Sequence, residues 1–141
     1  MWFLLSLFSM SVLIAQPLNA EENIGFGTIS LDQAKQLNNP VKHTQSSLNK
    51  GKLYFIQQCA GCHDRDGKGR SAVMGNAADL SRPSTWSQGD SDGEIFRTLH
   101  DGSGNNMPPF KYTITEDRDL WHLVNYVHSL RTNARKVEEE E

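Results

Sequence analysis

The stretch Cys59-Ala60-Gly61-Cys62-His63 contains both cysteines of the 141-residue chain, and a histidine directly follows the second of them. This C-x-x-C-H order is the attachment signature of c-type haem. Two thiols at this spacing reach two vinyl groups on one edge of a porphyrin, and the next residue then lies under the ring, where its imidazole can bind iron. The sequence therefore predicts one covalently bound haem c, attached through Cys59 and Cys62, with His63 as the proximal iron ligand.

A C-x-x-C pair is also compatible with a thioredoxin-like redox site, half of a zinc site or a local disulfide. Zinc needs further ligands, but no third cysteine exists, and the closest pair among the other histidines is His122 and His128, six positions apart. A redox pair should open a helix after a buried strand, whereas a helical pattern precedes this motif and a glycine-rich loop follows it. A disulfide would close too small a ring to stabilise much. We therefore prefer haem.

Residues 102–110 (G-S-G-N-N-M-P-P-F) form a polar, glycine-rich segment with a single methionine. A residue before proline is pushed towards extended geometry, and the two prolines stiffen the segment that holds Met107. A rigid loop that presents one thioether suits a sixth, weak-field iron ligand; the alternative is that Met107 anchors the loop in a small core. We predict Met107 as the distal ligand. The other histidines are expected to be solvated or structural: His43, His100, His122 and His128.

Hydrophobic spacing predicts three main helices, one before the haem motif and two in the second half of the chain. One covers 48–58, with Ser46 and Ser47 as candidate N-caps, and a second covers 93–101, with a capping box at 91–94. The last follows a Thr115 cap and presents a regular apolar stripe. The members of this stripe are Leu120, Leu123, Val124, Val127 and Leu130, with Asn125 on the opposite face.

Residues 64–93 show no alternating strand pattern and are expected to form a long loop that packs on the haem. Met74 and Leu80 are predicted to wall the pocket. Trp86 has three possible roles: a pocket wall, a donor of its indole N–H to a haem propionate, or an ordinary core residue.

Residues 1–20 contain no charged side chain and read as a secretory signal, with cleavage after Ala20. The alternative is an uncleaved anchor, although the apolar run 2–15 is shorter than the roughly 20 residues that a spanning helix needs. Export favours a periplasmic location. We expect 21–45 to be a polar N-terminal arm, 46–133 the haem domain, and 134–141 a disordered acidic tail. With a net charge of −3 and no basic stripe, nucleic-acid binding is not expected.

In its motifs and their order, the chain resembles a class I, single-haem bacterial cytochrome c. The quoted segments are Gly51-x3-Phe55, the haem motif at 59–63, Met107-Pro108-Pro109-Phe110 and Leu123-Val124-Asn125-Tyr126-Val127. The resemblance implies an all-α fold, with helices and loops wrapped around one covalently bound haem, and His63 and Met107 as axial ligands. It also implies that Gly51 and Phe55 contact Tyr126 where the first and last helices cross.

One family feature is missing. The family usually holds its proximal imidazole through a carbonyl in a proline-bearing loop, but no proline occurs between Asp64 and Arg82. The hydrogen-bond acceptor for His63 therefore cannot be assigned from the sequence.

The resemblance implies an electron-transfer protein and not an enzyme. Its partners would be redox proteins, namely a donor dehydrogenase or reductase and an acceptor oxidase or another cytochrome, with no small-molecule substrate. Two alternatives stay open: an electron-accepting subunit of a dehydrogenase or oxidase complex, docked through the arm, and a haem enzyme or gas sensor with an open distal site. Basic side chains near the haem edge are candidates for steering an acidic partner: Lys50, Lys52, Lys68, Arg70 and Lys111.

Overall fold

The computed structural model describes residues 24–70, 77–104 and 106–140. The expected signal segment and the predicted wall residue Met74 lie outside these residues. Within the described ranges the fold is all-α, as predicted: there is no strand, and the β-type pairing is an isolated bridge between Ser103 and Met107. None of the described helices combines the length and apolar character needed to cross a membrane.

The haem motif lies at the end of one continuous helical run. It consists of α2 (Gln45–Tyr54), a π-helical turn η1 (Phe55–Cys59) and α3 (Ala60–His63). Thr44 is the N-cap, and its Oγ1 accepts a hydrogen bond from the Ser47 backbone N–H at 3.2 Å, so the run begins before the predicted Ser46–Ser47 cap. It also continues to His63, beyond the predicted end at residue 58. π-helical turns are rare and often occur at functional sites.

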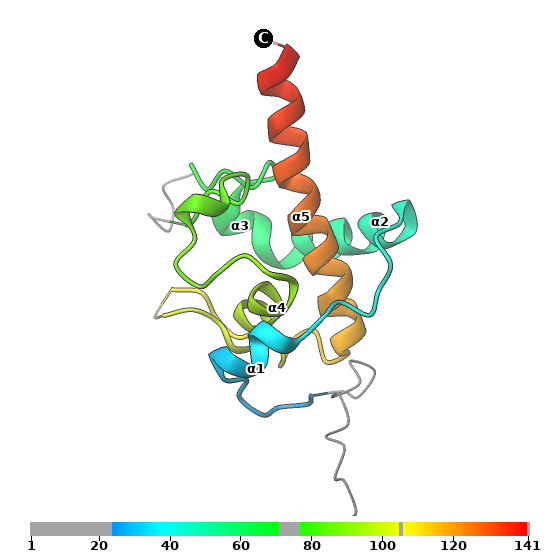
Figure 1. Ribbon diagram of the computed structural model, residues 1–141, viewed down its shortest axis with the longest axis vertical. Helices are drawn as coiled ribbons and strands as arrows, with labels where there is room; N and C mark the ends of the chain where they lie inside the picture. The colour runs from blue at the N-terminus through cyan, green and yellow to red at the C-terminus, as the bar shows by residue number, and fades with distance from the viewer. Residues whose placement is uncertain (1–23, 71–76, 105, 141) are drawn as a thin grey trace, which may run out of the picture.

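Helix α5 (Asp117–Glu140) crosses α2, as Figure 1 shows. At the crossing, a Cβ on Gly51 would collide with the His122 carbonyl and the Tyr126 side chain, so only glycine lets the two backbones approach. The Phe55 and Tyr126 rings meet at 5.2 Å between centroids, with an interplanar angle of 53°. The predicted contact of Gly51 and Phe55 with Tyr126 is confirmed.

The apolar stripe of α5 faces the core, as predicted. Its buried members are Leu120, Leu123, Val124, Val127 and Leu130. The helix begins at Asp117, after the predicted Thr115 cap, and its backbone stays helical to Glu140, where a disordered tail was expected. The prediction that Asn125 faces away from the core is wrong: this side chain is only 4% exposed and lies in the polar cluster described below.

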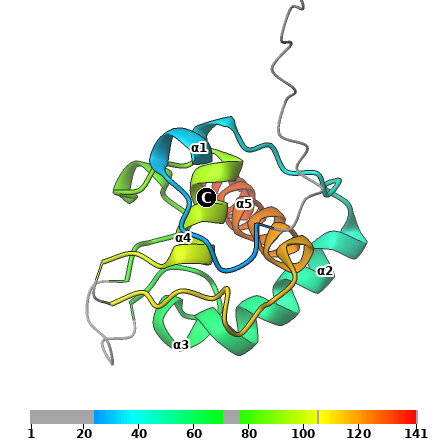
Figure 2. The ribbon, with the colours of Figure 1, turned by 90° about the horizontal axis from the view of Figure 1, so that it is seen from below.

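Two shorter helices pack against each other at the other side of the domain. Helix α1 (Leu31–Gln36) begins with a capping box between Ser30 and Gln33, and α4 (Asp92–Asp101) begins with the predicted capping box between Ser91 and Glu94. Gly93 lies against the Ala34 carbonyl, where a Cβ would collide. Figure 2 shows α1 and α3 on opposite sides of α4. Helix α4 therefore lies between the N-terminal segment and the haem motif.

The described part of the predicted arm, residues 24–45, is packed into the domain and does not precede it as a separate segment. Ile29, Ala34 and Val41 are buried in the same hydrophobic core as α4 and α5. These apolar residues are spaced too irregularly for the sequence to predict an amphipathic element. The packed unit therefore begins before residue 46, the predicted start of the haem domain.

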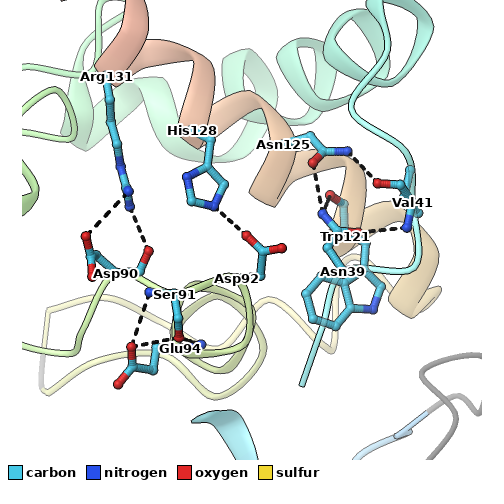
Figure 3. Close-up of polar contacts among 10 residues, drawn as sticks. All are labelled: Asn39, Val41, Asp90, Ser91, Asp92, Glu94, Trp121, Asn125, His128 and Arg131. Atoms are coloured by element: carbon cyan, nitrogen blue, oxygen red, sulfur yellow. Dashed lines mark hydrogen bonds and ion pairs between the residues drawn. The ribbon is translucent and has the colours of Figure 1, made fainter. Parts of the chain in front are cut away.

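Two side-chain amides, the half-buried Asn39 and the buried Asn125, fix the end of this segment to α5 (Figure 3). Asn39 donates from Nδ2 to the Asn125 Oδ1 at 2.9 Å and accepts from the Val41 backbone N–H at 2.9 Å. Asn125 in turn donates to the Val41 carbonyl at 3.1 Å and to the Ser47 Oγ at 2.8 Å. This cluster explains why a polar residue occupies a core position of α5: buried polar groups need partners, and here the partners come from the chain before α2 and from the first turn of α2.

Candidate haem site

All four predicted haem-binding residues line one cavity of about 380 Å³. Cys59, Cys62 and His63 reach it from the end of the α2–α3 run, and Met107 reaches it from the loop that follows α4. The remaining wall is mostly apolar, with side chains from the π-helical turn η1, from α4 and α5, and from the loops. It includes Phe55, Leu80, Ile95, Leu99, Phe110 and Val127. The predicted wall position of Leu80 is confirmed.

Both cysteines are free thiols, so the local disulfide considered above is not present. Cys59 is buried and Cys62 is half-buried. Burial, reinforced by the neighbouring Cys62, raises the pKa of the Cys59 thiol to about 12. Cys59 is therefore a protonated thiol facing an apolar cavity, unlike the low-pKa thiolate of a thioredoxin-like site.

The imidazole of His63 is held by a backbone carbonyl. Its Nδ1 lies 3.1 Å from the Ala78 carbonyl oxygen, which can only accept, so Nδ1 donates and Nε2 keeps its lone pair for a metal. Burial lowers the pKa of His63, against smaller opposite effects of the Ala78 hydrogen bond and of Asp64. The sequence left the acceptor unassigned because no proline marks the loop; a backbone carbonyl leaves no signal in residue type.

The loop that presents Ala78 is folded back by backbone hydrogen bonds. The Gly69 N–H donates to the His63 carbonyl at 3.0 Å, and the Leu80 N–H donates to the Gly67 carbonyl at 2.7 Å. Gly67 has φ +77° and lies against Leu130 of α5, so a side chain there would be strained and crowded. The orientation of His63 therefore depends on glycines in place of the family's proline.

The Met107 loop is shaped by a turn and a bridge. Helix α4 ends at Gly102, whose φ of +79° and ψ of −179° are a conformation that glycine alone adopts readily. Ser103 and Met107 exchange two backbone hydrogen bonds, at 2.9 and 3.2 Å, and the Phe110 N–H donates to the Leu99 carbonyl at 2.9 Å. The loop is thus closed on itself and fixed to the last turn of α4.

Trp86 lines the cavity, and its indole N–H donates to the Asp79 carbonyl at 2.9 Å. The guanidinium of Arg131 lies 4.2 Å from the centroid of its ring. Of the three predicted roles, Trp86 has that of a wall, and its one N–H donates to the backbone of the 77–80 loop.

The other histidines take no part in lining the cavity within the described residues. His100 is fully buried; Nδ1 lies 2.8 Å from the Asp101 carboxylate and Nε2 lies 2.7 Å from the Gly25 carbonyl, so both nitrogens have partners. His122 and His128 were expected to be solvated, but both are half-buried with side-chain partners. His122 Nδ1 is 2.9 Å from the Ser47 Oγ, and His128 Nε2 is 2.7 Å from Asp92 (Figure 3).

This combination of groups fits a covalently held haem. Two thiols, an imidazole nitrogen with a free lone pair and a thioether share one apolar cavity, and sulfur and imidazole are ligands that haem iron accepts. The fold and the site together define the class as a c-type cytochrome.

The family is shown by sequence. Residues 46–127, more than half of the chain, match the family model described as cytochrome C oxidase, cbb3-type, subunit III, and the chain belongs to this family. The family is one of cytochrome c domains that transfer electrons and carry haem c, so the prediction of haem c is confirmed.

Curated relatives are the cbb3-type cytochrome c oxidase subunits CcoP of Helicobacter pylori, including strain 52. Each is 34% identical over 98 residues, which cover 64% of this chain and 31% of the relative. The chain thus matches about a third of the length of these relatives.

Solved structures support the fold. Cytochrome cL from Hyphomicrobium denitrificans aligns with a TM-score of 0.55 and 23% identity over 79% of this chain and 66% of that chain. A chain of the Kuenenia stuttgartiensis reducing HAO-like protein complex aligns with a TM-score of 0.58 and 22% identity over 64% of this chain and 46% of that chain. The predicted small cytochrome c fold is confirmed.

Proposed function

We propose that this protein is a periplasmic single-haem electron carrier, with thioethers to Cys59 and Cys62 and with His63 and Met107 as the axial iron ligands. The observation that carries the proposal is the single apolar cavity lined by all four residues, which come from two separate segments of the chain. When bound, the haem supplies reversible one-electron exchange between ferric and ferrous iron.

The residues of the cavity have separate tasks in this proposal. The Ala78 carbonyl fixes the tautomer of His63, so that Nε2 is the coordinating nitrogen. The Met107 thioether stabilises the ferrous form and raises the potential. The apolar wall, which includes Phe55, Ile95 and Leu99, excludes water and disfavours the additional positive charge of the ferric form.

With both axial positions filled by the chain, no position is left for a substrate. Electrons then pass to and from other proteins through the edge of the ring. This favours a carrier over a haem enzyme or gas sensor, which needs a vacant or labile sixth position. Donors would be a dehydrogenase or reductase, and acceptors an oxidase or another cytochrome.

A second candidate function is an electron-accepting or electron-delivering subunit of an enzyme complex. It is favoured by the matched family, which is described as an oxidase subunit, over residues 46–127. Mild detergent extraction followed by pull-down of the tagged chain distinguishes the two. Stoichiometric co-purification of an oxidase or dehydrogenase supports the subunit role, whereas recovery of the cytochrome by itself supports a free carrier.

The first test of the ligand set is an optical titration of the exported protein. We expect a c-type spectrum, a ferric Met–iron charge-transfer band, and no change when carbon monoxide is added to the reduced form. Met107→Ala should abolish the band and allow prompt carbon monoxide binding, while Leu53→Ala, which removes an exposed apolar side chain of α2, is the control. Prompt carbon monoxide binding by the unmodified protein would contradict His/Met ligation and favour an enzyme or sensor.

A further inference from the structure

A buried ion pair lies at the base of the Met107 loop. The Lys111 Nζ donates to the Asp101 Oδ1 at 2.9 Å, and the two side chains are 8% and 9% exposed. Asp101 is the last residue of α4, directly before Gly102, and Lys111 directly follows Phe110. The pair therefore joins the two ends of the 102–110 loop. Lys111 was predicted to lie on the surface and to steer partners, and its burial shows that this prediction is wrong.

Backbone hydrogen bonds align the same two loop ends. The Phe110 N–H donates to the Leu99 carbonyl at 2.9 Å, and the Lys111 N–H to the His100 carbonyl at 3.4 Å. The ion pair extends this pairing outward from the cavity. Together the contacts limit how far Met107, four residues before Lys111, can move away from α4.

The N-terminal segment covers the pair and supplies its remaining partners. The Ile29 N–H donates to the Asp101 Oδ2 at 2.8 Å, and the Lys111 Nζ donates to the Gly27 carbonyl at 2.8 Å. Arg97 of α4 donates from Nε to the Ile29 carbonyl at 2.8 Å. Residues 25–29 are thus bound by α4 and by the loop end at once. They lie outside the region that matches the family model, 46–127.

The charges of this pair are satisfied only as a set. Burial disfavours ionisation of Asp101, but hydrogen bonds from Lys111, Ile29 and His100 hold the pKa of its carboxyl below the ordinary value. A buried charge that loses its partner is strongly destabilising, because water cannot replace the partner. A change in any member therefore loosens the base of the loop and the cover together.

We propose that Asp101 is a positioning residue for Met107: through Lys111 and Ile29 it ties the ends of the distal loop to each other and to the N-terminal segment, and so sets how readily the thioether leaves the iron. This inference rests on the proposed role of Met107 as the distal ligand. The tie holds the loop in the closed geometry and makes displacement of the thioether by an external ligand slow.

The test is the rate at which imidazole displaces the thioether in the ferric protein, followed by loss of the Met–iron charge-transfer band. For Asp101→Asn we expect displacement to be faster on the order of tenfold, since one lost buried charge contact exceeds the energy of a tenfold change. The measurement is made at a temperature where far-ultraviolet circular dichroism shows both proteins folded. Asp92→Asn is the matched control, because it removes a carboxylate that contacts a histidine at the other end of α4.

A second variant changes the other member of the ion pair, so that the test does not depend on how well Asp101→Asn folds. Lys111→Met retains the apolar stem and removes the ammonium, and it should also accelerate displacement. The double variant Asp101→Asn, Lys111→Met removes both charges of the pair together. If the pair acts by tying the loop, the double variant stays faster than the unmodified protein; a return to the unmodified rate would show that the single variants act through a stranded charge, and would overturn the proposal.

The outcomes separate this inference from the proposed function. An unmodified protein with a charge-transfer band and slow imidazole binding, whose rate is unchanged in Asp101→Asn and Lys111→Met, overturns the role of Asp101 and leaves His/Met ligation intact. An unmodified protein that lacks the band and binds imidazole at once contradicts Met107 ligation itself, and the positioning role fails with it.

Discussion

The two sides of the haem cavity are built in different ways. His63 lies at the end of a helical run and within four residues of both cysteines, so short-range chain geometry places it. Met107 lies in a loop between helices, where closure depends on Gly102, on a bridge to Ser103 and on contacts with α4. The place of His63 along the chain is set by the helical run, with the Ala78 carbonyl orienting its ring, whereas the place of Met107 is set by the closure of a loop against α4.

This difference indicates which part of the cavity can change its conformation while the haem stays attached. A loosened distal loop leaves the helical run and its thiols unchanged. A disturbed helical run affects attachment and ligation at the same time. Variants on the two sides should therefore fail in distinct ways.

The largest effect is expected on the proximal side. Replacing both thiols, Cys59→Ala with Cys62→Ala, should abolish covalent haem entirely, because the haem motif is the proposed attachment site. Haem staining of a denaturing gel and the intact mass measure this directly. Met107→Ala is the control and should keep its covalent haem; a stained band in the double-alanine protein would contradict the assignment of the thioethers.

A smaller effect, a loss of stability, is expected when the packing of α2 against α5 is disturbed. In Gly51→Val the new side chain would meet the His122 carbonyl and Tyr126 at the α2–α5 crossing. Overpacking of this kind lowers the free energy of unfolding by about 3 kcal/mol. Lys52→Val puts the same side chain on the exposed face of the same helix and should cost much less. Denaturant unfolding compares the two, and equal midpoints would argue against the close crossing.

A change in the Met107 loop should have a smaller effect, and it should alter the optical spectrum and not the haem content. Gly102→Ala forces a non-glycine residue into φ +79°, ψ −179° against the backbone of residues 107–109, at a cost of roughly 1–3 kcal/mol. We expect a weaker Met–iron charge-transfer band at unchanged haem content. Gly27→Ala, in a position with space for a methyl group, is the control. Loss of haem in Gly102→Ala would show that the two sides are not separable.

The smallest expected effect is a pH dependence of the stability that arises from His128, outside both sides of the cavity. Burial, followed by the nearby Arg131 charge, lowers the pKa of His128 despite its hydrogen bond to Asp92. A lowered pKa means that the unfolded chain takes up the proton more readily, so stability is full above the unfolded pKa of 6.5 and declines as the pH falls below it. His128→Gln, which keeps a donor for Asp92, should lessen the change of the melting temperature between pH 7.5 and 5.5, and His122, whose pKa burial also lowers, should account for part of what is left. A parallel pH dependence in the variant would exclude His128 as its source.

The sequence predicted what depends on short spacing. The haem motif, the α4 capping box and the apolar stripe of α5 all use neighbouring residues or fixed helical periods, whereas the contact of Gly51 with the last helix was implied only by the family resemblance. Each has a direct physical reading, because thiol reach, cap hydrogen bonds and side-chain direction are local properties.

The sequence did not predict what depends on partners from elsewhere in the chain. Asn125 and Lys111 look like surface residues, and both are buried because residues 27–47 supply acceptors. The acceptor of His63 is the backbone of Ala78, which any residue type could provide. The segment 24–45 has a polar composition, yet three apolar residues and its backbone polar groups fix it to α4 and α5.

The π-helical turn between α2 and α3 has a consequence for rotational phase along the helical run. In a regular α-helix each residue advances the side-chain direction by about 100°, and a π-turn accommodates roughly one additional residue within a turn. Gly51 and Phe55 can therefore stay directed at α5 while Cys59, Cys62 and His63 reach the cavity. Removing one residue from 56–58 would restore an ordinary helix and turn the haem motif by about one residue step relative to the crossing. The length of this short segment, more than its composition, keeps the core face and the cofactor face of one helix in register.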